Sequence, residues 1–191
     1  MTIFLILAPY GAFATLMLVT TADISLLCAA LICLAVIALD VARGRSIKIL
    51  GVGSVIVFTA IGSYLTFVDA TLSTTTVKIA VDAGIVLVSL SSILFGHPFT
   101  LQYAVEQVDA ATAQLPGFKQ ANDLITWAWT GAALLMMAGN IALLTMPDLP
   151  LWSGLLVAFA ARNSAVCFTR WYPQYRKAKY GTPPANALPS H

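Results

Sequence analysis

The chain has 191 residues, of which 59% are hydrophobic and 9% are charged, and its formal net charge is +2. Soluble domains carry about 25% charged residues, so a chain of this composition lacks the polar surface that would keep it dispersed in water. The small net charge does not by itself point to nucleic acid. A lipid bilayer is the solvent that fits, and we expect an all-α protein made of membrane-spanning helices.

Six hydrophobic segments follow one another, each close to the roughly 20 residues that a spanning helix needs. They are residues 2–20, 24–42, 49–68, 77–95, 124–145 and 151–169. The first is short and contains Pro9, so five spans stay open as the alternative to the six that we favour. Residues 1–180 form the predicted helical bundle. Residues 181–191, rich in proline and alanine, are expected to be disordered.

The connection between the fourth and fifth segments is long enough to hold structure of its own. Gly96 and Pro98 end the preceding helix, and apolar residues then recur at helical spacing until Pro116. Polar residues fall between them, a pattern typical of a short amphipathic helix at the membrane interface. The side chains expected to form an interfacial or partner-binding surface here are His97, Phe99, Leu101, Tyr103, Val105 and Val108.

The distribution of charge predicts an orientation. With six spans, most of the basic residues fall on one side, whereas Asp23, Asp69 and Asp148 fall on the other. The positive-inside rule then places both termini in the cytoplasm. Basic and aromatic residues after the sixth segment are expected to contact lipid headgroups, and these are Arg170, Trp171, Tyr172, Arg176, Lys177 and Lys179.

Ionisable residues within spanning segments are costly and are therefore candidate functional groups. Asp40, Asp82 and Arg162 qualify, and Asn140 and Asn163 add polar side chains. At 1.5 Å per residue, Arg162 lies roughly 12 Å inside the cytoplasmic boundary and Asp82 roughly 9 Å from the outer one. These depths favour an Arg162–Asp40 pair and an Asp82–Asn140 contact. Such a network either fixes the register of the helices or lines a path for a proton, an ion or a lipid headgroup, and snorkelling of Arg162 without a partner is a third possibility.

No catalytic or metal-binding pattern accompanies these groups in the sequence. His97 and His191 are the only histidines, whereas a zinc site needs three or four clustered ligands. The sequence has no Ser-His-Asp spacing, no paired carboxylates and no phosphate-binding glycine loop. We therefore expect no metal, no cofactor and no enzymatic activity.

Several features occur in a familiar order. The first segment has an early proline in Leu7-Ala8-Pro9, and the second ends in a basic turn. The fourth runs from Val77-Lys78-Ile79 to Gly96-His97-Pro98-Phe99, and the fifth is entered through Asn122 and Trp127 and holds Asn140. With the amphipathic connection and the basic tail, this order resembles the intracellular septation protein A family of small bacterial inner-membrane proteins over most of residues 3–180. Arg162 and the connection depart from the family's pattern.

The resemblance implies a non-enzymatic, multi-pass protein of the bacterial inner membrane that acts in septation and envelope upkeep by contacting other membrane proteins. Two other classes stay open. One is a small carrier or channel for a lipid or an ion, and the other is an accessory subunit of a larger membrane complex. A carrier predicts a cavity between the helices, whereas a fully packed interior with Arg162 paired would exclude it. In each case the expected partners are membrane lipids and membrane proteins, not nucleic acid.

Overall fold

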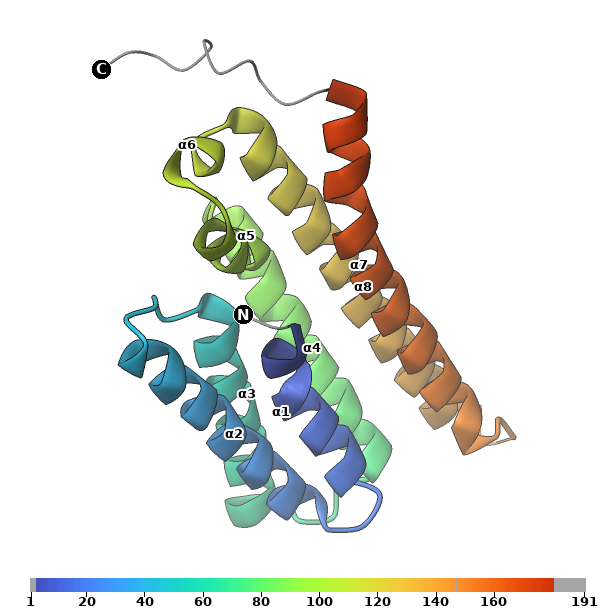
Figure 1. The fold of residues 1–191 in the computed structure, drawn as a ribbon. Helices are drawn as coiled ribbons and strands as arrows, with labels where there is room; N and C mark the ends of the chain where they lie inside the picture. The colour runs from blue at the N-terminus through green and yellow to red at the C-terminus, as the bar shows by residue number, and fades with distance from the viewer. Residues whose placement is uncertain (1–2, 147, 181–191) are drawn as a thin grey trace.

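The computed structural model describes residues 3–146 and 148–180. Over these residues the chain consists of helices and turns, without strands, which confirms the all-α prediction (Figure 1). The elements in chain order are α1 Ile3–Leu16, α2 Ala22–Ala42, α3 Ile49–Phe67, α4 Thr74–Leu94, α5 Phe99–Ala104, the 3-10 helix η1 Val105–Gln107, α6 Ala110–Ala113, α7 Pro116–Thr145 and α8 Leu151–Tyr180.

Four helices, α2, α3, α4 and α7, are long and apolar enough to cross a membrane. Large hydrophobic side chains on their outer faces are exposed, among them Leu31, Ile56, Leu87 and Leu135. Apolar surface of this extent is unfavourable in water and is normal against lipid acyl chains. Helix α1 has 14 residues, which cover about 21 Å, less than the roughly 30 Å of a hydrocarbon core. Four of the six predicted spans therefore have the required length and composition, and the chain has the character of a helical membrane protein.

Two helices extend beyond the predicted segments. Helix α7 begins at Pro116 rather than at residue 124, because proline is favoured in the first turn, where its missing N–H has no helical partner. Helix α8 continues through Pro173 to Tyr180, past the predicted end at residue 169. The basic and aromatic residues predicted as a tail thus form its last turns. The prediction of disorder for residues 181–191 lies outside the described residues.

The connection between α4 and α7 is not one amphipathic helix. Gly96 adopts a positive φ of 70° just after α4, a conformation that glycine reaches without steric cost. The chain then folds into α5, η1 and α6, which are short helical turns. Helix α5 packs against α7, so this segment belongs to the bundle and does not lie apart from it.

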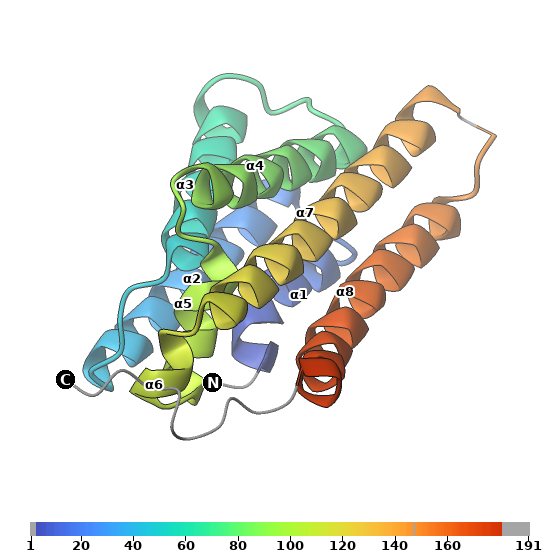
Figure 2. The same ribbon diagram turned by 90° about the horizontal axis from the view of Figure 1, so that it is seen from above.

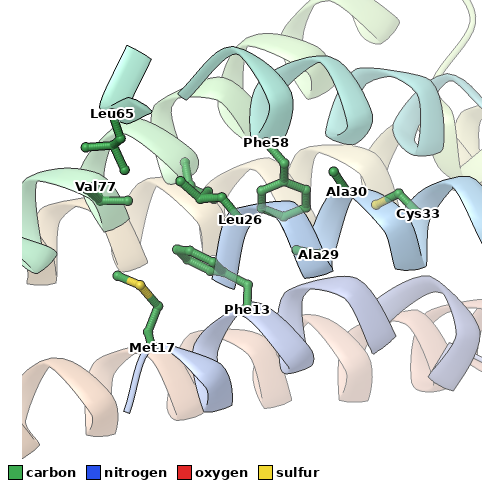
Figure 3. Packing of buried hydrophobic residues seen from close by; sticks show 10 residues of the cluster. Phe13, Met17, Leu26, Ala29, Ala30, Cys33, Phe58, Leu65 and Val77 are labelled. Carbon is green, nitrogen blue, oxygen red and sulfur yellow. The ribbon is translucent and has the colours of Figure 1, made fainter. Parts of the chain in front are cut away.

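Helices α1 to α4 share one hydrophobic core. Phe58 of α3 is fully buried, and its ring centroid lies 5.7 Å from that of Phe13 in α1. Leu26 of α2 and Val77 of α4 are also fully buried and belong to the same cluster (Figure 3). These helices are apolar on all sides, but one face of each packs against the neighbouring helices.

Glycines allow close approach between α3 and α4. A Cβ at Gly53 would lie 2.6 Å from the methyl groups of Val88, and a Cβ at Gly84 would lie 2.5 Å from Val57. Real Cβ atoms do not approach side chains so closely, so each glycine is needed for the separation of the two helices. Small residues at contact points are typical of helix packing in membranes, where backbones approach closely.

Helices α7 and α8 form a hairpin with its own contacts. Ala132 of α7 packs against Ala161 and Ala165 of α8. The indole N–H of Trp129 donates to the Thr169 hydroxyl at 2.9 Å. Helix α4 contacts both α3 and α7 and so links this hairpin to the other helices. Helices α1 and α8 lie on the same side of the α4–α7 pair (Figures 1 and 2).

Candidate lipid-facing cleft

A cleft with a volume of about 1000 Å³ lies between α1 and α8, with α4 and α7 behind it. This volume is at the upper end of the roughly 300–1,000 Å³ that small-molecule pockets occupy. Helix α5 and the residues after it line one end of the cleft. Much of the lining is apolar and includes Phe13, Met17, Ile85, Ile125, Met136 and Leu155.

Polar side chains from α4 and α7 meet at the back of the cleft. The Asn140 amide donates a hydrogen bond to a carboxylate oxygen of Asp82 at 2.8 Å. This is the Asp82–Asn140 contact that the depths of the two residues predict. Lys78, one turn before Asp82, also lines the cleft, and its charge acts on the Asp82 carboxyl.

Arg162 of α8 lines the cleft and is half-buried. Its charge acts on Asp82 of α4 and on the Tyr10 hydroxyl of α1, so it lies within electrostatic range of both helices. Within the described part of the chain it makes no hydrogen bond and no salt bridge. Arg162 thus lines the cleft without a counter-ion in contact among the described residues.

The predicted Arg162–Asp40 pair is not formed. Asp40 is buried, and one of its carboxylate oxygens lies 3.6 Å from the Arg45 guanidinium. The physical reason is local, because the Arg45 N–H donates to the Asp40 carbonyl at 2.9 Å and closes the turn that follows α2. Arg45 therefore forms the salt bridge with Asp40 in place of Arg162.

Asn163 also lies outside the network to which the sequence assigns it. Its side chain is exposed, and its amide donates to the Phe159 carbonyl of its own helix at 2.8 Å. Adjacent positions on a helix point about 100° apart, so Arg162 and Asn163 are directed to different surroundings.

A second polar cluster joins η1 to the turn before α3. Lys48 is only 3% exposed and forms a salt bridge with Glu106, and its ammonium also donates to the Ser46 hydroxyl at 2.8 Å. The Ile49 N–H at the start of α3 donates to the Gln102 side chain at 2.8 Å. This cluster fixes the connection to the α2–α3 turn.

The electrostatics of this cluster follow from its contacts. Burial by itself raises the pKa of Glu106, but contact with Lys48 and Ser46 outweighs it and holds this pKa below the ordinary range. Burial raises the pKa of the Tyr103 hydroxyl, and the neighbouring Asp40 and Glu106 carboxylates act in the same direction. Glu106 and Lys48 were not among the predicted site residues. Two features of the sequence point to these residues. Gln102 and Glu106 are one helical turn apart, and the turn before α3 is basic, so it can pair with an acidic side chain.

The expected partner surface is divided by the fold. Phe99 is 5% exposed and lies within the bundle, so its ring is not available to a partner. Next to it, the Thr100 hydroxyl bonds the Thr126 hydroxyl at 2.7 Å, which ties α5 to α7. The Tyr103 ring lies beneath the Lys48 ammonium and also lines the cleft. Of the remaining predicted residues, His97 and Val105 are exposed, and Leu101 and Val108 are half-buried.

The last turns of α8 carry a ladder of aromatic rings. Phe168 stacks on Tyr172 with centroids 5.1 Å apart, and Trp171 stacks on Tyr175 at 5.0 Å. The Lys179 ammonium lies 5.6 Å from the Tyr175 ring centroid. Contact of Arg170, Trp171, Tyr172, Arg176, Lys177 and Lys179 with lipid headgroups stays a prediction.

No family model, no curated protein and no solved structure matches this chain. The resemblance to the septation family therefore stays a prediction from the sequence. The described residues also hold no group of three or more His, Cys, Asp or Glu side chains that could bind a metal ion.

Proposed function

We propose that this protein binds a membrane lipid in the cleft between α1 and α8. The observation that carries the proposal is Arg162, which lines the cleft without a hydrogen-bond or salt-bridge partner in the described part of the chain. A charge held in surroundings of low dielectric constant is costly unless a counter-ion or hydrogen bonds compensate it. An anionic headgroup would supply both, and the apolar lining suits acyl chains.

In this proposal α1 and α8 cross the bacterial inner membrane together with α2, α3, α4 and α7, the bilayer is thinned locally around the short α1, and both termini face the cytoplasm. Arg162 is the one charged residue between positions 151 and 168, so most of the first half of α8 is apolar. The basic residues of the last turns of α8 would lie at the cytoplasmic surface. With α1 and α8 spanning, the mouth of the cleft opens sideways into the bilayer, where lipid is the abundant ligand.

The experiment is extraction into nanodiscs directly from membranes, followed by native mass spectrometry. We expect a stoichiometric lipid on the wild-type protein. Ala158→Trp, which places an indole in the cleft, should remove it. Ala160→Trp is the matched control, because Ala160 lies on the exposed face of the same helix. Equal lipid occupancy in the wild type and in Ala158→Trp would contradict the proposal.

A second candidate function is interaction with other membrane proteins in septation or envelope upkeep, as a scaffold or as an accessory subunit. The resemblance to the septation family and the 39% exposed Val105 on the connection support it. Val105→Asp would then reduce the recovery of cross-linked partner proteins without lowering the amount of inserted protein. Unchanged partner recovery would count against this candidate.

A further inference from the structure

Three cations line the cleft at different heights. Lys78 lies one turn into α4, whereas Arg162 and Arg170 lie near the middle and in the second half of α8. Helices α4 and α8 begin at the same end of the molecule (Figure 1). At 1.5 Å per residue, Lys78 lies about 6 Å from that end, Arg162 about 16 Å and Arg170 about 28 Å. The cations are therefore separated by roughly 10–12 Å along the cleft.

The charge of the cleft favours anions. Asp82 is the one acidic residue among the described lining residues, and Asn140 already occupies one of its carboxylate oxygens. Three cations thus face one anion. Guanidinium groups bind phosphate through paired, charge-assisted hydrogen bonds, which makes a phosphate-bearing headgroup the complementary ligand.

The depth of Arg162 matters for what a bound lipid does. A lipid at rest keeps its headgroup at the membrane surface, beyond the reach of a side chain near the middle of a spanning helix. A headgroup that contacts Arg162 has therefore already moved into the hydrocarbon region. The apolar lining between the cations and the lateral mouth of the cleft would let the acyl chains stay in the bilayer during this movement.

We infer that the cleft is a path along which the headgroup of an anionic phospholipid crosses the bilayer, with Lys78, Arg162 and Arg170 as successive phosphate contacts. This inference rests on the proposed function, since it requires lipid in the cleft. Passage needs sites that bind well enough for entry and weakly enough for exit, and several cations in series meet that requirement better than one strong site. Apolar walls along most of the path select a lipid over free phosphate.

The test is a lipid-translocation assay in phosphatidylcholine vesicles that contain the purified full chain and a trace of phosphatidylglycerol with a nitrobenzoxadiazole fluorophore on one acyl chain. Dithionite added outside bleaches the outer leaflet at once and reaches inner-leaflet probe only as that probe crosses. We expect the wild-type protein to expose the inner pool, and phosphatidylglycerol to cross faster than equally labelled phosphatidylcholine. Arg162→Gln should slow crossing by about tenfold, the effect of losing one charge-assisted hydrogen bond.

Two further variants keep the test decisive. Arg162→Lys retains the charge and should recover part of the rate. Asn163→Gln alters the neighbouring exposed position and should match the wild type. Correct folding of each variant is checked by its thermal transition in the same vesicles, so that a misfolded Arg162→Gln protein is not counted as a slow one.

The outcomes separate the two proposals. Lipid bound in nanodiscs without accelerated crossing would overturn the path and leave lipid binding intact. Equal crossing rates for Arg162→Gln and the wild type, or equal rates for the anionic and zwitterionic probes, would likewise overturn the inference. Absence of both bound lipid and crossing would overturn the proposed function as well.

Discussion

The Asn140 amide lies 2.8 Å from a carboxylate oxygen of Asp82, and this hydrogen bond ties α7 to α4 at the back of the cleft. The two residues are 58 positions apart in the chain. The bond lies where the α1–α4 core meets the α7–α8 hairpin, so it helps to join these two parts and also supplies part of the polar lining of the cleft.

Asn140→Leu tests how much this hydrogen bond contributes to the stability of the protein. The substitution leaves the Asp82 carboxylate without its hydrogen bond in an apolar environment, and we expect a loss of about 1–3 kcal/mol in stability. Asp82→Asn is the matched control, since its amide oxygen still accepts from Asn140. Thermal unfolding in nanodiscs measures both variants. An Asn140→Leu protein as stable as the wild type would show that the contact contributes nothing.

Gly53→Ala tests the close approach of α3 and α4. The new methyl group would lie 2.6 Å from the side chain of Val88, and overpacking of this kind costs about 1–3 kcal/mol. The double variant Gly53→Ala/Val88→Ala should recover much of the stability because it removes the clash. Gly131→Ala in α7 is the control, since a Cβ there meets nothing within 4 Å. If Gly53→Ala, the double variant and Gly131→Ala have the same melting temperature, the packing described for Gly53 is wrong.

The Glu106–Lys48 salt bridge predicts a dependence on acid. The pKa of Glu106 is lower in the folded protein than the ordinary value of 4.5, so the folded state binds the proton less tightly than the unfolded chain. The stabilisation is complete above the pKa of the unfolded chain. It is lost as the pH falls from there through the lower pKa of the folded protein. The protection factors of the amides in residues 99–107, which correct for the slower intrinsic exchange at low pH, should therefore fall on acidification.

Glu106→Gln provides the comparison for this pH effect. It should exchange faster than the wild type at neutral pH, because Lys48 then lacks its carboxylate partner. Its protection factors should also change less between neutral and acidic pH. Parallel pH profiles for the two proteins would exclude Glu106 as the titrating group.

Cysteine accessibility tests whether α8 spans the membrane. In a protein whose Cys28, Cys33 and Cys167 are replaced by alanine, single cysteines at positions 148 and 177 report on the two ends of α8. If α8 spans the membrane, an impermeant maleimide added to intact cells labels position 148, and position 177 is labelled only after the membrane is opened. Labelling of both from the same side would leave α8 outside the set of spanning helices.

Much of the helical architecture follows from hydrophobic segments alone. The predicted segments at residues 24–42, 49–68 and 77–95 agree with α2, α3 and α4 within a few residues, because Asp23, Lys48 and Gly96 lie close to their ends. The start of α7 and the end of α8 differ from the prediction, because polar residues do not stop a helix that packs on a neighbour, whereas the predicted end of α7 at residue 145 and start of α8 at residue 151 are confirmed. Trp129 and Thr169, for example, join these helices close to the region that the sequence assigns to loops.

The polar contacts show where sequence reasoning stops. Residue depth along a helix is readable from the sequence, and it sufficed for Asp82 and Asn140. Depth alone does not give the direction in which a side chain points, and this is why Asp40 pairs with Arg45 rather than with Arg162. The cleft itself arises from the lateral placement of α1 and α8, which no local pattern encodes.

Photolabelling with a lipid that carries a diazirine in its acyl chain tests lipid occupancy of the cleft most directly. Peptide mapping by mass spectrometry then shows which residues the lipid touches. We predict labels on Ile85, Met136 and Ala158, which line the cleft, and their loss when Ala158→Trp fills it, while labels on exposed Leu87 and Leu135 persist. Labels confined to outward-facing residues, unchanged by Ala158→Trp, would contradict lipid binding in the cleft.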